Sequence, residues 1–384
     1  MRRWSVFVFL VVLTACQQVQ SPRFERATSI PPYQLNSFAD YQQATYQWLT
    51  RHRMPVTKNA DWEVKLNTPF TCGENRSTGV LLVHGLGDSP YFFHDIARDL
   101  CAQGYQVRTI LLPGNGSKPG DMLNADFDLW QDVTSHHISQ FSRETDTLFL
   151  GGFSTGANLV TLAAHSRNDI AGLLLFSPAF ESNFFATRLA PFMTGIYPWP
   201  NLEPEDNPTR YNSVAMTGFA AYQNSVEALA DAFDEQALSL PVFMVVAEQD
   251  SVVDVQRVAE YFDTGFNTSI KSMMWLGEAA PDMKNIEGYT MQLPEYRIGA
   301  SSHMAVLFSP GNVLYGTKGK LRICDNGQSE EKTRACENGE PVWFGPWGLT
   351  EEGKVYARLT YNPYYDTMMT QVKDFLKYAG QQSQ

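Results

Sequence analysis

The sequence has little positive charge and no apolar segment of membrane-spanning length near its start. Its 384 residues carry 29 Lys and Arg against 41 Asp and Glu, a formal net charge of −12. Because so acidic a chain repels phosphate backbones, we expect no nucleic-acid partner. The apolar run over residues 4–13 reaches only half of the roughly 20 residues that a membrane-spanning helix needs. No internal repeat or low-complexity tract is present, so we expect an ordinary globular protein.

The amino-terminal segment has the features of an export signal. A basic start, Met1-Arg2-Arg3, precedes the short apolar run, and Leu13-Thr14-Ala15-Cys16 follows it. These four residues resemble a bacterial lipobox, whose cysteine sulfur is acylated and which implies a lipoprotein signal peptide over 1–15. Cleavage by ordinary signal peptidase is the alternative.

A lipobox implies that the protein is held at a membrane through acyl chains on Cys16. Gln17 stands where an inner-membrane retention signal has Asp, so the resemblance implies a bacterial outer-membrane lipoprotein that faces the periplasm or the cell surface. Residues 16–37, rich in Gln, Ser and Pro, are predicted to form a flexible tether.

Cysteine is scarce, with five in the chain, of which four lie beyond the lipobox. In an exported protein, Cys72, Cys101, Cys324 and Cys336 can form disulfides in three connectivities. We favour 324–336, which closes a short polar loop, together with 72–101. Neither pair has the spacing of metal ligands, so we expect no metal site.

Apolar runs and helical patterns alternate along the chain from residue 38. Buried strands are predicted over 80–83, 105–112, 147–151, 170–176, 242–247 and 272–276, an edge strand over 61–70, and helices over 38–53, 91–103, 126–141, 157–165 and after Asn362-Pro363. This alternation predicts an α/β domain over 38–384, with one mostly parallel sheet between helices. Two segments interrupt the pattern: a predicted cap over about 180–238, and a disulfide-closed insertion over about 311–360.

A candidate nucleophile lies where a predicted strand turns into a helix. Gly152-Phe153-Ser154-Thr155-Gly156 fits a tight, strained turn that lifts the Ser154 hydroxyl above the sheet edge, with small residues relieving the crowding. The motif alone is weak, and a plain glycine-rich turn is the alternative. Its position between strand and helix favours the nucleophile.

A serine hydroxyl needs a base, and the chain has seven histidines. In hydrolases with this type of turn the base follows the nucleophile along the chain, which leaves His165 and His303. His165 lies on the predicted helix after Ser154, about 16 Å along its axis, and so points away from the serine. His303 is therefore the predicted base, although an ordinary loop histidine is the alternative.

The acid that orients the base is expected in the loop after the strand over 242–247. Asp250 follows that strand by three residues and is the predicted partner of His303. Asp254 and Glu248 are the alternatives, although Asp254 is placed to cap the next helix.

An oxyanion hole is predicted at His84-Gly85-Leu86-Gly87-Asp88, which follows the first buried strand. The backbone N–H groups of Leu86 and Thr155 are its expected donors, and His84 is expected to hold the loop without transferring protons. The alternative is an ordinary turn at a strand end.

Taken together, these motifs and Leu112-Pro113-Gly114-Asn115-Gly116-Ser117 resemble the α/β-hydrolase superfamily. The chain is most similar to its monoacylglycerol lipase and carboxylesterase branch, also called serine aminopeptidase-like. The resemblance covers about residues 75–310 and the last helix, and it implies a catalytic triad of Ser154, Asp250 and His303 without a cofactor. The family's usual Pro-Gly-His-Gly-x-Ser has Asn115 in place of histidine, a position outside the triad.

The predicted cap suggests the substrate. Aromatic residues crowd into its first twenty positions, and we expect an acyl-binding wall that includes Phe184, Phe185, Phe192 and Trp199. A small core internal to the cap is the alternative reading. The sequence thus predicts a serine hydrolase for esters, with monoacylglycerol or a similar lipid as substrate.

Two other functions stay open. An aminopeptidase-like enzyme would need an acidic patch for the substrate's ammonium group, and Glu181, Glu203, Glu205 and Asp206 lie in the cap. The other possibility is a lipoprotein that has the hydrolase scaffold but only binds lipids or a partner, without catalysis. Comparing the hydrolysis of amide and ester substrates distinguishes the peptidase from the esterase. Covalent labelling of Ser154 by a fluorophosphonate distinguishes an enzyme from a protein that only binds.

Overall fold

The computed structural model describes residues 21–382 apart from residue 75. The predicted signal peptide over 1–15 and Cys16 lie outside the described residues. Among the helices described, none combines the length and apolar character needed to cross a bilayer.

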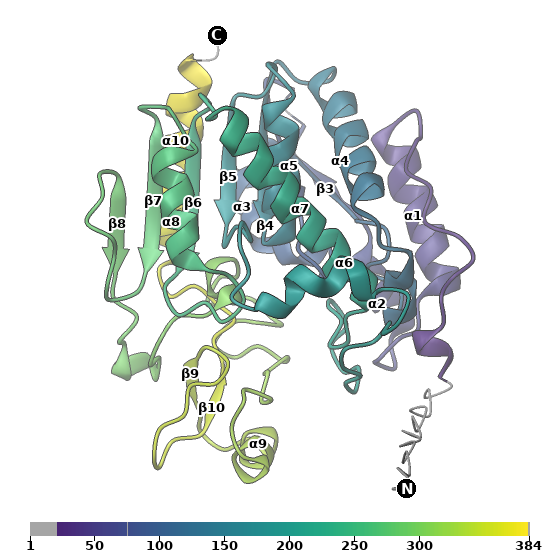
Figure 1. Ribbon diagram of the computed structural model, residues 1–384, viewed down its shortest axis with the longest axis vertical. Helices are drawn as coiled ribbons and strands as arrows, with labels where there is room; N and C mark the ends of the chain where they lie inside the picture. The colour runs from purple at the N-terminus through teal and green to yellow at the C-terminus, as the bar shows by residue number, and fades with distance from the viewer. Residues whose placement is uncertain (1–20, 75, 383–384) are drawn as a thin grey trace, which may run out of the picture.

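The centre of the fold is an eight-stranded sheet in the order β1-β3-β2-β4-β5-β6-β7-β8 (Figure 1). Its strands are β1 (Thr71–Cys72), β2 (Thr78–Val83), β3 (Gln106–Ile110), β4 (Thr147–Phe153), β5 (Gly172–Phe176), β6 (Val242–Ala247), β7 (Lys271–Leu276) and β8 (Ile286–Tyr289). Every neighbouring pair is parallel except the edge pair of β1 and β3. The mostly parallel sheet predicted from the apolar runs is confirmed.

Helices cover both faces of this sheet (Figure 1). One layer contains α4 (Phe127–Ser142), α5 (Thr155–His165), α7 (Met216–Glu235) and α8 (Val255–Thr264), and the other contains α3 (His94–Ala102) and α10 (Tyr365–Gln382). Successive strand residues alternate between the two cores. In β2, Leu81 and Val83 face the first core, whereas Val80 and Leu82 face the second. The central strands are therefore apolar on both faces, as buried parallel strands require.

The predicted cap is smaller in the structure than in the sequence analysis. The segment after β5 contains a 3-10 helix, η4 (Phe185–Leu189), and the short helix α6 (Ala190–Met193) before α7. However, Val226, Leu229 and Phe233 of α7 belong to the main core beside α5. Their spacing is helical, so α7 is a layer helix of the domain and the cap ends before it.

The predicted edge strand over 61–70 is wrong, because this segment forms helix α2 (Ala60–Asn67) after helix α1 (Phe38–His52). Asn59 caps α2 through its side chain, which accepts a hydrogen bond from the Trp62 backbone N–H at 3.1 Å. The strand prediction took the charged residues of this segment to be exposed, but the Glu63 side chain is fully buried.

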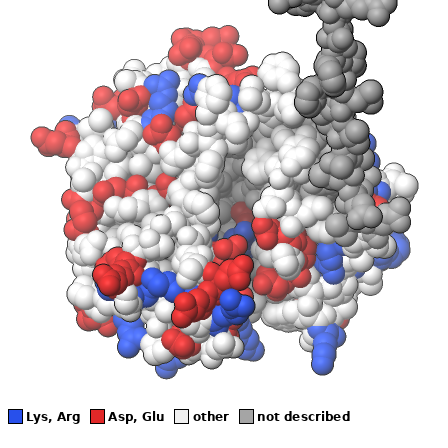
Figure 2. Space-filling model, turned by 60° about the horizontal axis from the view of Figure 1, so that its bottom comes forward, with Lys and Arg blue, Asp and Glu red and all other residues white. Residues whose placement is uncertain are grey.

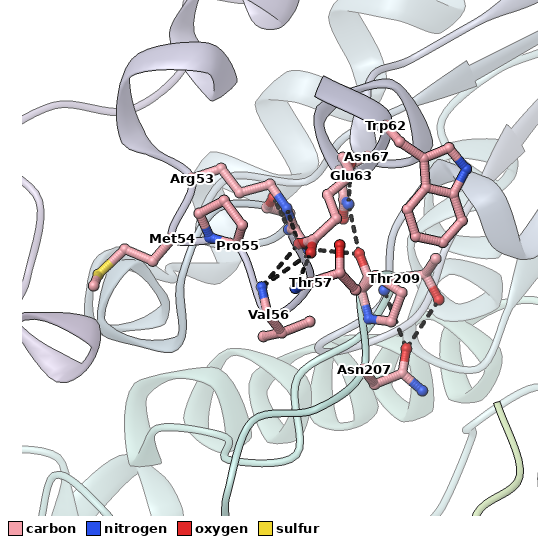
Figure 3. Close-up of polar contacts among 12 residues, drawn as sticks. Arg53, Met54, Pro55, Val56, Thr57, Trp62, Glu63, Asn67, Asn207 and Thr209 are labelled. Atoms are coloured by element: carbon pink, nitrogen blue, oxygen red, sulfur yellow. Dashed lines mark hydrogen bonds and ion pairs between the residues drawn. The ribbon is translucent and has the colours of Figure 1, made fainter. Parts of the chain in front are cut away.

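Glu63 forms a buried ion pair with Arg53, which follows α1 (Figure 3). Arg53 Nη2 donates to Glu63 Oε2 at 2.7 Å and to the Pro208 carbonyl at 2.6 Å. Asn67 also donates to Pro208 O at 2.8 Å, and the Val56 N–H donates to Glu63 Oε1 at 3.0 Å. The network therefore fastens the α1–α2 pair to the cap loop that contains Pro208.

Substituting Glu63 with glutamine is expected to lower the free energy of unfolding by about 3 kcal/mol, because Arg53 would keep a buried charge without its counterion. Urea unfolding measures the loss. The exposed pair of Asp61 and Lys65 on the same helix provides the control, and Asp61→Asn is expected to have little effect. Equal effects of the two substitutions would contradict the importance assigned to the buried pair.

The described part of the predicted tether, residues 21–37, packs along the domain instead of extending freely. Arg23 Nη1 donates to the Met54 carbonyl at 2.8 Å. The Phe24 ring meets the Trp199 ring edge-to-face, with centroids 5.2 Å apart. The flexibility was predicted from the Gln, Ser and Pro composition alone. Composition carries no information on contacts with distant segments such as these.

The insertion over about 311–360 forms a small unit of its own at the lower end of the molecule in Figure 1. It contains α9 (Glu330–Glu337) and a parallel pair of strands, β9 (Trp343–Gly345) and β10 (Tyr356–Arg358). Both favoured disulfides are present: Cys324–Cys336 closes this unit, and Cys72–Cys101 joins β1 to α3.

A buried histidine in α4 is expected to make the fold less stable in acid. His137 is 2% exposed and its ring lies 4.2 Å from the Tyr41 ring. Burial, reinforced by the nearby charges of His136 and Arg108, lowers the pKa of His137 to about 3. Below about pH 6.5 the His137 ring therefore binds a proton in the unfolded chain but stays neutral in the folded protein.

As pH falls from 6.5 toward 3, this proton uptake favours unfolding. The wild type therefore loses stability between pH 7.5 and pH 4.5. By linkage, we expect this loss to be smaller in His137→Phe by about 2–3 kcal/mol, because the variant has no histidine to protonate at this position. Urea unfolding at both pH values measures it. An equal loss in the two proteins would contradict the prediction.

Candidate active site

Ser154 lies at the turn from β4 to α5 and has the strained backbone expected of a nucleophile. Its φ of 54° and ψ of −122° fall where residues other than glycine are rare. A Cβ added to Gly156 would lie 2.1 Å from the Val83 carbonyl oxygen, and one added to Gly152 would lie 2.4 Å from the Ala157 nitrogen. Both glycines of the motif are thus required by close backbone approaches.

His303 and Asp250 form a hydrogen-bonded pair at the same end of the sheet. His303 Nδ1 donates to Asp250 Oδ2 at 2.6 Å, and the aspartate side chain is 1% exposed. Asp250 Oδ1 accepts from the backbone N–H groups of Val252 at 2.8 Å and Val253 at 3.0 Å. These bonds fix the carboxylate, which in turn fixes one ring orientation of His303.

The other candidate acids have structural partners. Asp254 caps α8 by accepting from the Gln256 and Arg257 N–H groups. Glu248 accepts from Trp275 Nε1 at 3.2 Å and from the Ala279 N–H at 2.7 Å. Neither forms a hydrogen bond with His303, whereas Asp250 does, so the geometry favours Asp250.

The insertion braces the loop that carries His303. Ser302, the preceding residue, donates through its hydroxyl to the Leu359 carbonyl, and the Gly299 N–H donates to the Phe344 carbonyl at 2.9 Å. From the sheet side, Ser177 Oγ donates to the His303 carbonyl at 3.3 Å. The imidazole therefore depends on contacts from two segments far apart in sequence.

Ser154, Thr155, Leu86 and His303 line one cavity of about 270 Å³. In the part of the chain that is described, the backbone N–H groups of Leu86 and Thr155 donate no hydrogen bond. This places two available donors beside the candidate nucleophile, as an oxyanion hole requires.

The loop that carries Leu86 is held by buried polar side chains. His84 Nδ1 donates to the Gly85 carbonyl at 2.8 Å, while its Nε2 accepts from the Leu112 N–H at 3.1 Å. Burial lowers the pKa of His84 to about 4, so the ring is neutral at neutral pH. Asn115, at the family's histidine position, accepts from the Gly87 N–H at 2.9 Å. Both residues position the loop.

The predicted acyl-binding aromatics are placed differently from one another. Phe184 lines the cavity, but Phe185 and Phe192 are 70% and 78% exposed and do not line it. Trp199 packs on Phe24 and does not line the cavity either. Composition identified the aromatic segment, but the direction of each side chain depends on the turns of η4 and α6.

Sequence analysis missed three charged side chains that line the cavity, namely Asp88, Arg210 and Arg358. Burial raises the pKa of Asp88 to about 7, partly offset by the charges of Arg210 and His303. Asp88 belongs to the motif His84–Asp88, for which the sequence predicts only a role of backbone N–H groups in the oxyanion hole. Arg358 comes from the insertion, and nothing in the sequence indicated that this segment reaches the site.

A strained serine between a parallel strand and a helix, beside a histidine–aspartate pair at the carboxyl ends of the strands, is the arrangement of an α/β hydrolase. The comparisons with known proteins agree. The model of the family "Serine aminopeptidase, S33" matches residues 74–272, which is more than half of the chain. The chain belongs to this family of serine hydrolases.

Individual relatives are lipolytic enzymes. A thermostable monoacylglycerol lipase from Bacillus sp. (strain H-257) is 30% identical over 108 residues, which span 28% of this chain and 43% of the relative, so the match covers less than half of that enzyme. A solved structure from work on LipS and LipT, two metagenome-derived lipolytic enzymes, has a TM-score of 0.50 at 20% identity and covers 55% of this chain and 87% of that one. This structural likeness confirms the fold.

Proposed function

We propose that the protein hydrolyses carboxylic esters that carry an apolar acyl chain, with Ser154 as nucleophile, His303 as base and Asp250 as the orienting acid. The observation that carries this proposal is that Ser154 and His303 line one cavity while Asp250 holds the far side of the imidazole. Family membership and the lipolytic relatives support the same reaction class.

In the proposed reaction, Ser154 Oγ attacks the ester carbonyl carbon while His303 Nε2 takes the hydroxyl proton. The negative oxygen of the tetrahedral intermediate is bound by the N–H groups of Leu86 and Thr155. When the intermediate collapses, the ester C–O bond breaks and His303 returns the proton to the leaving alcohol. Water then attacks the acyl-enzyme with His303 as base, which releases the carboxylic acid and restores the Ser154 hydroxyl.

Lipid-like esters, including monoacylglycerols, are the proposed substrates. Part of the cavity wall is apolar and consists of Leu86, Ala179, Phe184, Val214, Phe219 and Val252. Such a wall favours an acyl chain over a polar peptide.

Aminopeptidase activity finds less support in the acidic residues that it would need. Glu181 pairs with Arg188 at 3.2 Å, and Glu205 accepts from the N–H groups of Asn212 and Ser213. Neither these two nor Glu203 and Asp206 line the cavity beside Ser154.

A series of p-nitrophenyl esters of increasing acyl length tests the proposal, with matching p-nitroanilides of amino acids for comparison. We expect a Ser154-dependent profile with its maximum at medium or long acyl chains. Activity confined to acetate and butyrate, or to the anilides, would contradict the lipid-like substrate. Absence of all hydrolysis would favour a lipoprotein that only binds lipids or a partner.

We further propose that the protein is a lipoprotein of the bacterial cell envelope, anchored through Cys16. The lipobox-like sequence supports this proposal. Cells grown with labelled palmitate are expected to incorporate label into the wild type and not into Cys16→Ala. The label must stay bound to the wild-type protein, processed to begin at Cys16, after extraction with organic solvent, and this protein must partition with outer membranes. Equal labelling of both proteins would contradict the anchor.

A further inference from the structure

The cavity beside Ser154 is lined by two unlike kinds of side chain. The apolar residues described above form part of its wall, whereas Arg210, Arg358 and Asp88 contribute charge to the same cavity. Figure 2 looks toward the end of the molecule where the cap and the insertion lie, and shows a hollow with mainly uncharged surface above it and with both acidic and basic side chains along its lower margin. A substrate that fills such a cavity is expected to be amphiphilic.

The two arginines come from segments outside the central sheet and its layers. Arg210 lies in the cap loop before α7, and Arg358 is the last residue of β10 in the insertion. Both also line a neighbouring cavity of about 570 Å³, formed by residues 203–212 of the cap and residues of the insertion. Their side chains therefore stand where the space beside Ser154 continues toward the insertion.

Neither guanidinium has a carboxylate partner among the described residues, because no ion pair within 4.0 Å involves Arg210 or Arg358. Arg210 Nε donates to the Tyr211 carbonyl at 3.4 Å, and Arg358 Nε donates to Asn326 Oδ1 at 2.7 Å. Arg210 Nη1 also donates to the sulfur of Met304 at 3.8 Å. The two Nη atoms of Arg358 donate no hydrogen bond to any of the residues that the structure describes.

The two positive charges also repel each other. Burial, together with the charge of Arg210, lowers the pKa of Arg358 to about 10, although the charges of Asp325 and Asp250 act in the opposite direction. Arg358 still carries its charge at neutral pH, so two cations remain close together in a partly buried place. A bound anion would relieve both the repulsion and the lost hydration.

Asp88 does not fill this role. Among the residues that the structure describes, it is the only one with a carboxylate that lines this cavity, and it forms no ion pair within 4.0 Å with either arginine. Burial raises its pKa to about 7, so a large share of Asp88 is uncharged at neutral pH. Four more carboxylates, those of Glu203, Asp206, Asp325 and Glu337, line the neighbouring cavity, but none of them forms an ion pair within 4.0 Å with Arg210 or Arg358.

We propose that Arg210 and Arg358 form a subsite for an anionic group, a phosphate or a carboxylate, on the alcohol part of the ester. The inference rests on the proposed function and names its substrate class: an apolar acyl chain lies against the cap wall while the negative headgroup lies between the two guanidinium groups. Guanidinium groups bind both anions through paired hydrogen bonds.

Three esters of the same medium-length fatty acid test the subsite on the wild-type protein: the neutral monoacylglycerol, the acylglycerol phosphate, and the ester of lactic acid, which carries a carboxylate. We expect kcat/KM for one of the two anionic esters to exceed that for the neutral ester by about tenfold or more. The better of the two identifies the headgroup as phosphate or carboxylate. A preference for the neutral ester would overturn the subsite.

Arg210→Gln and Arg358→Gln are expected to lower the ratio of anionic to neutral kcat/KM by about tenfold or more, chiefly through KM for the anionic ester. Arg334→Gln is the matched control, because Arg334 lies on α9 of the same insertion and its side chain is 68% exposed. The control is expected to keep the wild-type ratio. An unchanged ratio in both pocket variants, with urea unfolding like that of the wild type, would overturn the assignment.

Failure of the subsite and failure of the proposed function give different results. Hydrolysis of p-nitrophenyl esters that depends on Ser154, without preference for anionic esters, overturns the subsite alone. Absence of hydrolysis for every ester overturns both.

Discussion

Replacing Ser154 with alanine is expected to reduce kcat for p-nitrophenyl ester hydrolysis by about 10³- to 10⁶-fold. Alanine has no hydroxyl to form the acyl-enzyme, so only the oxyanion donors and the binding of substrate remain. The loss is measured under saturating substrate, together with urea unfolding to show that the variant is folded.

Ser166→Ala provides the matched control for this prediction. Ser166 follows the opposite end of α5 and is exposed, so its removal leaves the turn at Ser154 unchanged. We expect this control to retain wild-type kcat. Comparable activity in Ser154→Ala and the control would show that another residue is the nucleophile.

Asp250→Asn is expected to lower kcat by about 10⁴-fold while the protein stays folded. Asp250 Oδ1 accepts from the Val252 and Val253 N–H groups, and an asparagine keeps these bonds by placing its amide oxygen there. Its NH₂ group then faces His303 Nδ1, which must become an acceptor. The ring proton moves to Nε2, where it blocks proton transfer from Ser154.

Asp254→Asn and Glu248→Gln serve as controls for the choice of acid. Asp254 caps α8 and Glu248 binds groups near β7, so each substitution is expected to affect stability more than kcat. A kcat loss in Asp254→Asn that matches or exceeds the loss in Asp250→Asn would contradict the triad proposed here.

Much of the scaffold could be predicted because its signals are local. The continuous apolar run of β6 marks a strand buried on both faces, and its predicted bounds agree with the structure. The motif around Ser154 gained its meaning from its place between such a strand and a helix, and the structure places Ser154 at that turn. Periodicity and turn chemistry are properties of neighbouring residues, so the sequence displays them directly.

The parts that could not be predicted depend on contacts between distant segments. Helix α2 was mistaken for a strand because the buried role of Glu63 depends on Arg53 and on the cap loop. Phe185 and Phe192 looked like wall residues, but their outward direction is set by the path of the cap. Arg358 reaches the cavity only because the insertion folds back over the His303 loop.

The central claim is that Ser154 is an activated nucleophile, and labelling with a fluorophosphonate tests it most directly. The probe forms a covalent phosphonyl bond with a serine oxygen that a neighbouring base has activated. We predict a single adduct, mapped by peptide mass spectrometry to Ser154, that is lost in Ser154→Ala and strongly slowed in Asp250→Asn. A folded wild-type protein that is not labelled, or is labelled at another serine, would contradict the account.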